Sequence, residues 1–120
     1  GGHWGGGMFL SARDQARLGM FTLRRGNWKG EQLVPEEWFD MATTPSTPNP
    51  GYGFMNYFLN GPGEDGSKAY PSAPDAAYTH RGSGTNLVYV DPVNDLVVVA
   101  RWIQGTAIDP FLAKVIESIN

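Results

Sequence analysis

An unbroken apolar run near the C-terminus is the sequence feature that most constrains the fold of this chain. Leu96–Ala100 reads LVVVA, without any alternation of polar and apolar residues. A strand of this kind needs apolar cover on both faces, so we expect it inside a sheet with helices on either side. Residues 85–90 form a second apolar run, and residues 91–95 (DPVND) have turn chemistry between the two. The sequence therefore predicts an antiparallel hairpin.

Two further segments have the composition of strands. Residues 76–81 lead into the Gly-Ser-Gly step at 82–84, and residues 52–59 (YGFMNYFL) are rich in aromatic side chains. The first is expected to pair with the hairpin as a three-stranded meander, and the second to be one continuous strand beside it. A connector is expected over residues 27–33, a proline-rich extended loop over 43–50, and loosely ordered chain over 60–74.

Three helices are predicted from capping residues and apolar periodicity. Ser11 is expected to cap a helix over residues 12–25 that Gly26 ends, and Pro35 to begin a short helix reaching residue 42. The last helix is expected to have Asp109 as its N-cap and Pro110 at its first position. In the first helix, one face collects Ala12, Ala16, Gly19, Met20 and Leu23. Leu18 and Phe21 point elsewhere, so they either pack on flanking segments or face sequence outside the chain. The predicted fold class is α+β, an antiparallel sheet flanked by helices.

Composition excludes several classes of function. A chain of 120 residues fits one domain, and its net charge of −3 with scattered Lys and Arg argues against nucleic acid as a partner. No apolar run approaches the roughly 20 residues of a membrane span. With no cysteine and two histidines at no ligand spacing, we expect neither thiol chemistry nor a metal, and no cofactor. Because the chain opens on glycines without Met, we expect it to be a piece of a longer protein.

His80 is the candidate for chemistry, and no serine in the chain has a base beside it in sequence. Gly-x-Ser-x-Gly and Ser-x-x-Lys are both absent. A histidine in a strand more often has a structural role, with its ring hydrogen-bonded to a neighbouring group, than a catalytic one. His80 is nevertheless followed by Gly82 and Ser83, where glycine permits close approach and backbone N–H groups can act as oxyanion donors. Two interpretations are open for the aromatic residues Trp4, Tyr52, Tyr57 and Tyr78. They either line a pocket beside His80 or belong to the core.

Several segments, in order, resemble the serine β-lactamase-related superfamily, which includes class C β-lactamases, penicillin-binding proteins and related esterases. They are GGGMFLSARD at 5–14, QLVPEEW at 32–38, YGF at 52–54, HRG at 80–82, YVDP at 89–92 and DLVVV at 95–99. His-Arg-Gly falls where that family carries Lys-Thr-Gly or His-x-Gly. The resemblance implies that residues 1–120 are a single partial domain, the C-terminal portion of a β-lactamase/transpeptidase-like fold.

The resemblance also implies roles for the residues around His80. His80 would lie opposite the nucleophile and bind the carboxyl or carbonyl end of a small-molecule or peptide substrate, with Arg81 beside it. Gly82 would keep the strand edge open, and the N–H of Ser83 would supply half of the oxyanion hole. The family's Ser-x-x-Lys and Tyr-x-Asn motifs are not in the chain, so its partner would be the N-terminal part of the same domain. The isolated chain is expected to be inactive.

Two functions from different classes remain open. The first is a fragment of a serine hydrolase acting on an ester, amide or lactam; His-Arg-Gly in place of Lys-Thr-Gly favours an esterase or peptidase. The alternative is a non-catalytic domain that binds a ligand or partner through the same sheet edge. By resemblance alone, the parent protein would be periplasmic or secreted.

Overall fold

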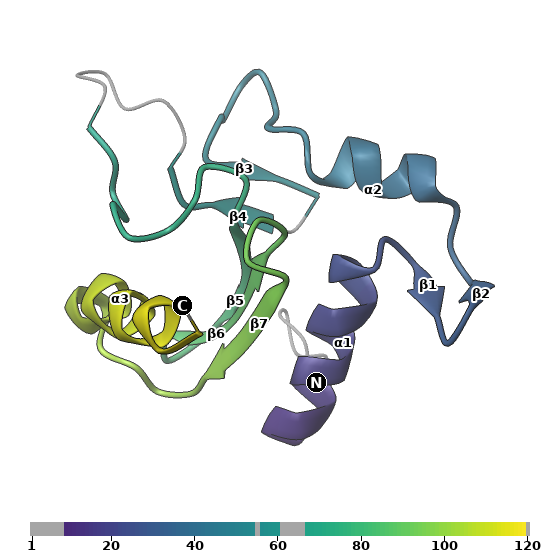
Figure 1. The fold of residues 1–120 in the computed structure, drawn as a ribbon. Coiled ribbons are helices and arrows are strands. Elements are labelled where there is room, and N and C mark those ends of the chain that lie inside the picture. The colour runs from purple at the N-terminus through teal and green to yellow at the C-terminus, as the bar shows by residue number, and fades with distance from the viewer. Residues whose placement is uncertain (1–8, 55, 61–66, 120) are drawn as a thin grey trace, which may run out of the picture.

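A five-stranded antiparallel sheet lies between two helices in the computed structural model, which describes residues 9–54, 56–60 and 67–119 (Figure 1). The sheet has the order β3-β4-β5-β6-β7, and α1 and α3 cover its opposite faces. The predicted α+β class is confirmed. None of the helices in the described part of the chain is long and apolar enough to cross a membrane. The expected loop over residues 1–7 lies outside the described residues.

The connections between successive elements differ widely in length, and residues 59–77 form the longest one. The helices are α1 (Ala12–Leu23), α2 (Glu36–Ala42), the 3-10 turn η1 (Gly105–Ala107) and α3 (Ile108–Ile119). The strands of the sheet are β3 (Tyr52–Gly53), β4 (Asn56–Phe58), β5 (Tyr78–Gly82), β6 (Asn86–Asp91) and β7 (Leu96–Ala100). A separate two-stranded ribbon is formed by β1 (Asn27–Trp28) and β2 (Glu31–Gln32).

The apolar strand β7 lies at the edge of the sheet, which corrects the expectation that it lies inside. Its residues are half-buried throughout, whereas β6 is buried from Leu87 to Asp91. Cover on both faces is nevertheless present: Val97 and Val99 pack on the α1 side, and Leu96, Val98 and Ala100 on the α3 side. An all-apolar sequence indicates that both faces of a strand are covered by other residues. It does not indicate whether the strand has a neighbouring strand on both of its edges.

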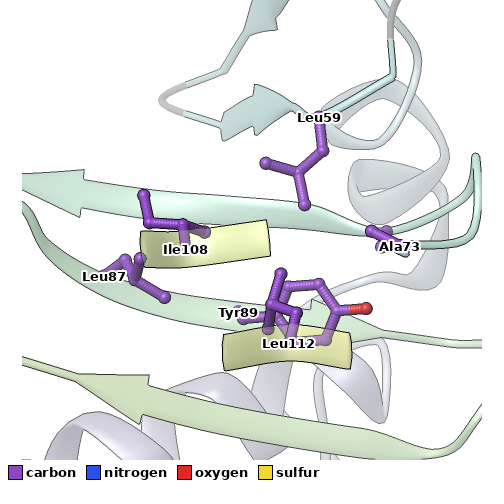
Figure 2. Packing of buried hydrophobic residues seen from close by; sticks show 7 residues of the cluster. Leu59, Ala73, Leu87, Tyr89, Ile108 and Leu112 are labelled. Carbon is purple, nitrogen blue, oxygen red and sulfur yellow. The ribbon is translucent and has the colours of Figure 1, made fainter. Parts of the chain in front are cut away.

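The larger core cluster lies between α3 and the sheet. Ile108 and Leu112 of α3 lie over Leu87 and Tyr89 of β6, as Figure 2 shows. All four are at most 2% exposed. Because β6 alternates its side chains between the faces, Val88 and Val90 point the other way and form a second cluster with Tyr78. The sheet therefore carries an apolar cluster on each face.

Helix α1 begins where predicted and packs closely on β6 and β7. The hydroxyl of Ser11 accepts a hydrogen bond from the N–H of Asp14 (3.1 Å), which confirms it as the N-cap. The helix ends at Leu23, two residues early, and Gly26 follows with a φ of 81°. Gly19 is its buried residue, and a Cβ built on it would lie 2.6 Å from Val97 Cγ1. Met20, expected on the buried face, is exposed.

Three local predictions are wrong. Residues 27–33 are not a simple connector but the β1–β2 hairpin, whose two-residue turn has positive φ at Lys29 (55°) and Gly30 (91°). Residues 52–59 are not one strand: the chain reverses at Phe54, with φ 49°, and β3 and β4 pair antiparallel. Helix α3 starts at Ile108 rather than after Asp109.

Two polar side chains fix the loops beneath α3. Asp109 does not cap its own helix; its carboxylate accepts hydrogen bonds from the backbone N–H (3.0 Å) and hydroxyl (3.2 Å) of Ser72. Asn60 donates to the carbonyls of Tyr70 (3.0 Å) and Ala73 (2.8 Å). The described part of the segment expected to be loosely ordered, residues 67–74, is therefore held against the core, with Ala73 buried.

Candidate functional site

A pocket of about 450 Å³ opens on the α1 side of the sheet, where helices α1 and α2 meet strand β5. This volume falls within the range of small-molecule sites. Most of its lining is aliphatic or aromatic, and among the described residues the lining includes no Asp, Glu, Lys or Arg. The lining residues are Leu18, Phe21, Thr22, Val34, Trp38, Phe39, Ala42, Thr43, Phe54, Asn56, Tyr78 and His80.

Aromatic edge-to-face contacts build the wall of the pocket. Phe39 is buried and packs against both Phe21, at a centroid distance of 6.0 Å, and Trp38, at 4.9 Å. Trp38 in turn meets Phe54, at 6.3 Å. These contacts join α1, α2 and the β3–β4 turn into one surface. Phe21 therefore packs on a flanking segment, which was one of the two alternatives open for it.

Polar contacts from the end of α1 hold α2 in place. Arg25 forms ion pairs with Glu36 (2.8 Å) and Asp40 of α2. The side-chain amide of Gln32 donates to the carbonyls of Arg25 and Val34, both at 2.6 Å. The pocket wall formed by α2 is therefore anchored to the segment that follows α1.

Asn56 is the buried polar side chain of the pocket. It is 3% exposed, and its Nδ2 donates a hydrogen bond to the carbonyl of Ala42 (2.7 Å). Its Oδ1 accepts no hydrogen bond within the described part of the chain. A buried amide oxygen without a donor is uncommon, because leaving it unpaired costs free energy.

His80 reaches the pocket from β5, and its ring lies edge-on to that of Tyr78, with a centroid distance of 5.7 Å. Burial raises the pKa of the Tyr78 phenol, and a hydrogen bond with Thr22 opposes that rise. The phenol is therefore neutral at physiological pH. His80 and Tyr78 share the α1 face because they are two residues apart on one strand.

Arg81 lies on the other face of the sheet from His80. Its Nε donates to Thr79 Oγ1 (2.9 Å) and its Nη2 to the hydroxyl of Tyr70 (3.2 Å). The guanidinium lies 5.4 Å from the ring centroids of both Tyr57 and Tyr70. The structure therefore does not bring Arg81 to the pocket that His80 borders.

Gly82 ends β5 and Ser83 begins the turn that follows, and both residues are exposed. A Cβ built on Gly82 would meet no atom within 4 Å, so the strand is open there. Asn86 organises the turn: its Nδ2 donates to the carbonyl of Ser83 (2.6 Å), and its Oδ1 accepts from the N–H of Trp102 (3.1 Å). His80, Gly82 and Ser83 thus follow one another from the pocket to the exposed end of β5.

Only some of the aromatic residues expected near the site line the pocket. Tyr78 lines the pocket, whereas Tyr52 and Tyr57 make an edge-to-face contact with each other (4.8 Å between ring centroids) outside it, and Trp4 is not among the described residues. The sequence reasoning did not identify Asn56. Asn56 could have been noticed as the one side-chain amide within the aromatic run at 52–59. Because that run was interpreted as one continuous strand, the sequence reasoning placed no hydrogen-bonding partner beside it.

Comparison with known proteins adds no assignment, because no family model and no curated protein matches the chain. Within the described residues, no three His, Asp or Glu side chains gather as metal ligands would.

Proposed function

We propose that this chain supplies one wall of the active site of a serine hydrolase of the β-lactamase-related superfamily, which transfers acyl groups through a serine ester. The observation that carries the proposal is the alignment along β5, where His80 borders an apolar pocket and Gly82, two residues later, lies beyond Thr79, the last residue of β5 that pairs with β4. An open edge lets an extended substrate lie against the strand, and the pocket beside it can hold a side group.

Each residue of this wall has a role that its position allows. His80 binds the carboxyl or carbonyl end of the substrate at the mouth of the pocket. The N–H of Ser83, an exposed residue, donates to the oxyanion that develops on the substrate carbonyl, and Gly82 leaves room for that carbonyl to approach. Arg81, on the opposite face, has no contact with substrate in this proposal and stabilises the sheet through Tyr57 and Tyr70.

The nucleophile belongs to another part of the parent protein. Four of the described serines use their hydroxyl groups in local hydrogen bonds: Ser11 with Asp14, Ser46 with backbone carbonyls, Ser72 with Asp109 and Ser118 with Val115. None of these contacts involves a histidine or a lysine that would activate the oxygen. The isolated chain is therefore expected to have no hydrolase activity.

The test is covalent labelling of the full-length parent with a fluorescent serine-directed phosphonate. We expect labelling of a serine outside residues 1–120, and a rate about tenfold lower in His80→Ala. Arg81→Lys is the matched control, because it changes the next residue of the same strand on the opposite face and should label at the unmodified rate. A parent protein that takes no label would exclude the hydrolase.

A second candidate function is a non-catalytic domain that binds a small molecule. The favouring observation is the pocket itself, whose wall is complete without a nucleophile. Such a domain would take no phosphonate label and would still bind an apolar ligand, so labelling and binding measured on the same protein separate the two candidates.

A further inference from the structure

The pocket bordered by α1, α2 and β5 combines a neutral apolar lining with one buried acceptor. We propose that it binds a neutral aromatic group carrying a single N–H or O–H donor, which donates to Oδ1 of Asn56. This inference concerns ligand binding alone and stands whether or not the parent protein is a hydrolase.

The lining sets the charge of the ligand. None of the twelve lining residues is Asp, Glu, Lys or Arg. A charged group buried in such a pocket would lose its hydration, and His80 is the only one of these lining side chains that could carry a positive charge beside it, so burying a charge away from His80 is costly. The faces and edges of Phe21, Trp38, Phe39 and Phe54 instead favour a flat apolar group, since aromatic rings pack well edge-to-face and offset.

The volume sets the size of the ligand. An apolar cavity of about 150 Å³ is enough to take up benzene. The pocket here, at about 450 Å³, has room for a two-ring group together with a substituent. Leu18, Trp38 and Phe54 are each more than one-third exposed, so the rim is open to solvent and a ligand can enter without a helix moving.

Asn56 sets the polar contact. Its Nδ2 is committed to the carbonyl of Ala42, which fixes the orientation of the amide and leaves Oδ1 as the group that can accept. A ligand donor would satisfy a buried oxygen that has no donor within the described residues, and because that oxygen is fully buried, lining side chains must shift to admit the donor. A ligand that offers only an acceptor would leave that oxygen unpaired and would bind less well.

The experiment uses two probes of nearly the same shape, 2-naphthol and 2-methoxynaphthalene, of which only the first has a donor. Binding to the 120-residue chain is followed by NMR through the indole N–H of Trp38, with dissociation constants from the titration. We expect both probes to shift this resonance and 2-naphthol to bind about five- to tenfold more tightly. Equal affinities, or no binding by either probe, would overturn the proposal.

Variants then locate the contact. Asn56→Leu keeps the approximate volume without the acceptor, so the preference for 2-naphthol should disappear while 2-methoxynaphthalene keeps its affinity within about twofold. Leu18→Glu places a charge at the rim and should weaken both probes about tenfold. Met20→Glu, on the same helix but outside the lining, is its control and should weaken neither. A preference that survives in Asn56→Leu and is lost in His80→Ala would assign the acceptor to His80 and overturn the proposal.

Asn56→Leu also loses the hydrogen bond to Ala42 and could misfold for that reason. A measurement on the unmodified chain therefore tests the same contact without a substitution. The side-chain carbonyl carbon of Asn56 should shift when 2-naphthol binds and stay unchanged with 2-methoxynaphthalene. The same response to both probes would contradict a donor contact at this oxygen.

Discussion

The indole of Trp102 lies so close over Gly84 that no side chain fits between them. A Cβ built on Gly84 would overlap the six-membered ring, and Gly84 has a φ of 77°. Trp102 itself has a positive φ of 57° and is 72% exposed, held by its N–H bond to Asn86. A bulky residue with positive φ is a strained arrangement, and here it fixes the turn that follows His80.

Gly84→Ala is therefore expected to destabilise the protein by about 2 kcal/mol or more, because it adds overpacking to an unfavourable φ. Gly82→Ala is the matched control two residues away, where the added methyl group meets open space, and it should change stability by less than about 0.5 kcal/mol. Urea unfolding followed by circular dichroism measures both. Equal losses of stability in the two variants would contradict the role given to Trp102.

Asp91 is a fully buried carboxylate at the β6–β7 turn, and its neighbours satisfy it. It accepts hydrogen bonds from the hydroxyl of Tyr89 (2.8 Å), the N–H groups of Val93 (2.9 Å) and Asn94 (3.0 Å), and the side-chain amide of Asn94 (2.7 Å). Asp91→Ala leaves these donors without their acceptor and should cost about 3 kcal/mol of unfolding free energy. Asp95→Asn, at the exposed end of the same turn, removes the charge of a surface ion pair with Arg24, keeps a residue type that tolerates the φ of 51° there, and should hardly move the urea midpoint.

The buried tyrosines predict loss of stability in alkali. Burial raises the pKa of Tyr89, as does its hydrogen bond to Asp91, and burial also raises the pKa of Tyr78. Because each folded-state pKa exceeds the unfolded value of about 10, the stability contributed is complete below pH 10 and is lost as the pH rises above it. Absorbance at 295 nm should show two of the five tyrosines ionising only as the protein unfolds. All five ionising together in folded protein would exclude this.

Tyr89→Phe isolates the larger of these effects. It removes the phenol that resists ionisation, so the decline in stability above pH 10 should be shallower than in the unmodified protein. It should also cost about 1 kcal/mol at neutral pH, because the hydrogen bond to Asp91 is lost. An unchanged alkaline slope would mean that Tyr89 already ionises in the folded state.

Local chemistry allowed part of the fold to be predicted. Ser11 caps α1 because its hydroxyl reaches an N–H three residues away, and the turn at 91–95 depends on Asp91 bonding to residues just after it. The split of residues 52–59 into two strands was missed because Phe54 is not a turn-forming residue, yet it adopts a φ of 49°. Its ring gains contact with Trp38, which lies on a helix that the sequence does not place nearby.

The candidate site, like the fold, was predicted from the sequence only in part. His80 was identified from the glycines that follow it, and the opposite placement of Arg81 follows from the two-residue period of a strand. The pocket could not be predicted, since Phe21, Phe39 and Asn56 meet only when α1, α2 and β4 are packed together. The unpaired acceptor of the pocket, Oδ1 of Asn56, results from the hydrogen bond between the Asn56 amide and the Ala42 carbonyl. No sequence pattern predicts this tertiary contact.

Gly19 determines how closely α1 approaches the sheet, and this contact can be tested by a double-mutant cycle. A Cβ at Gly19 would lie 2.6 Å from Val97 Cγ1 and 2.8 Å from Val88 Cγ1. Gly19→Ala improves helix propensity by up to about 1 kcal/mol, but it pushes against two stiff β-branched side chains and should destabilise the protein by about 1 kcal/mol net. Val97→Ala removes the nearer methyl groups but leaves Val88, so Gly19→Ala made in that background should be clearly less destabilising than in the unmodified protein. The coupling free energy from urea unfolding of the four proteins should therefore approach about 1 kcal/mol, and additive effects would show that α1 does not touch β7 at Gly19.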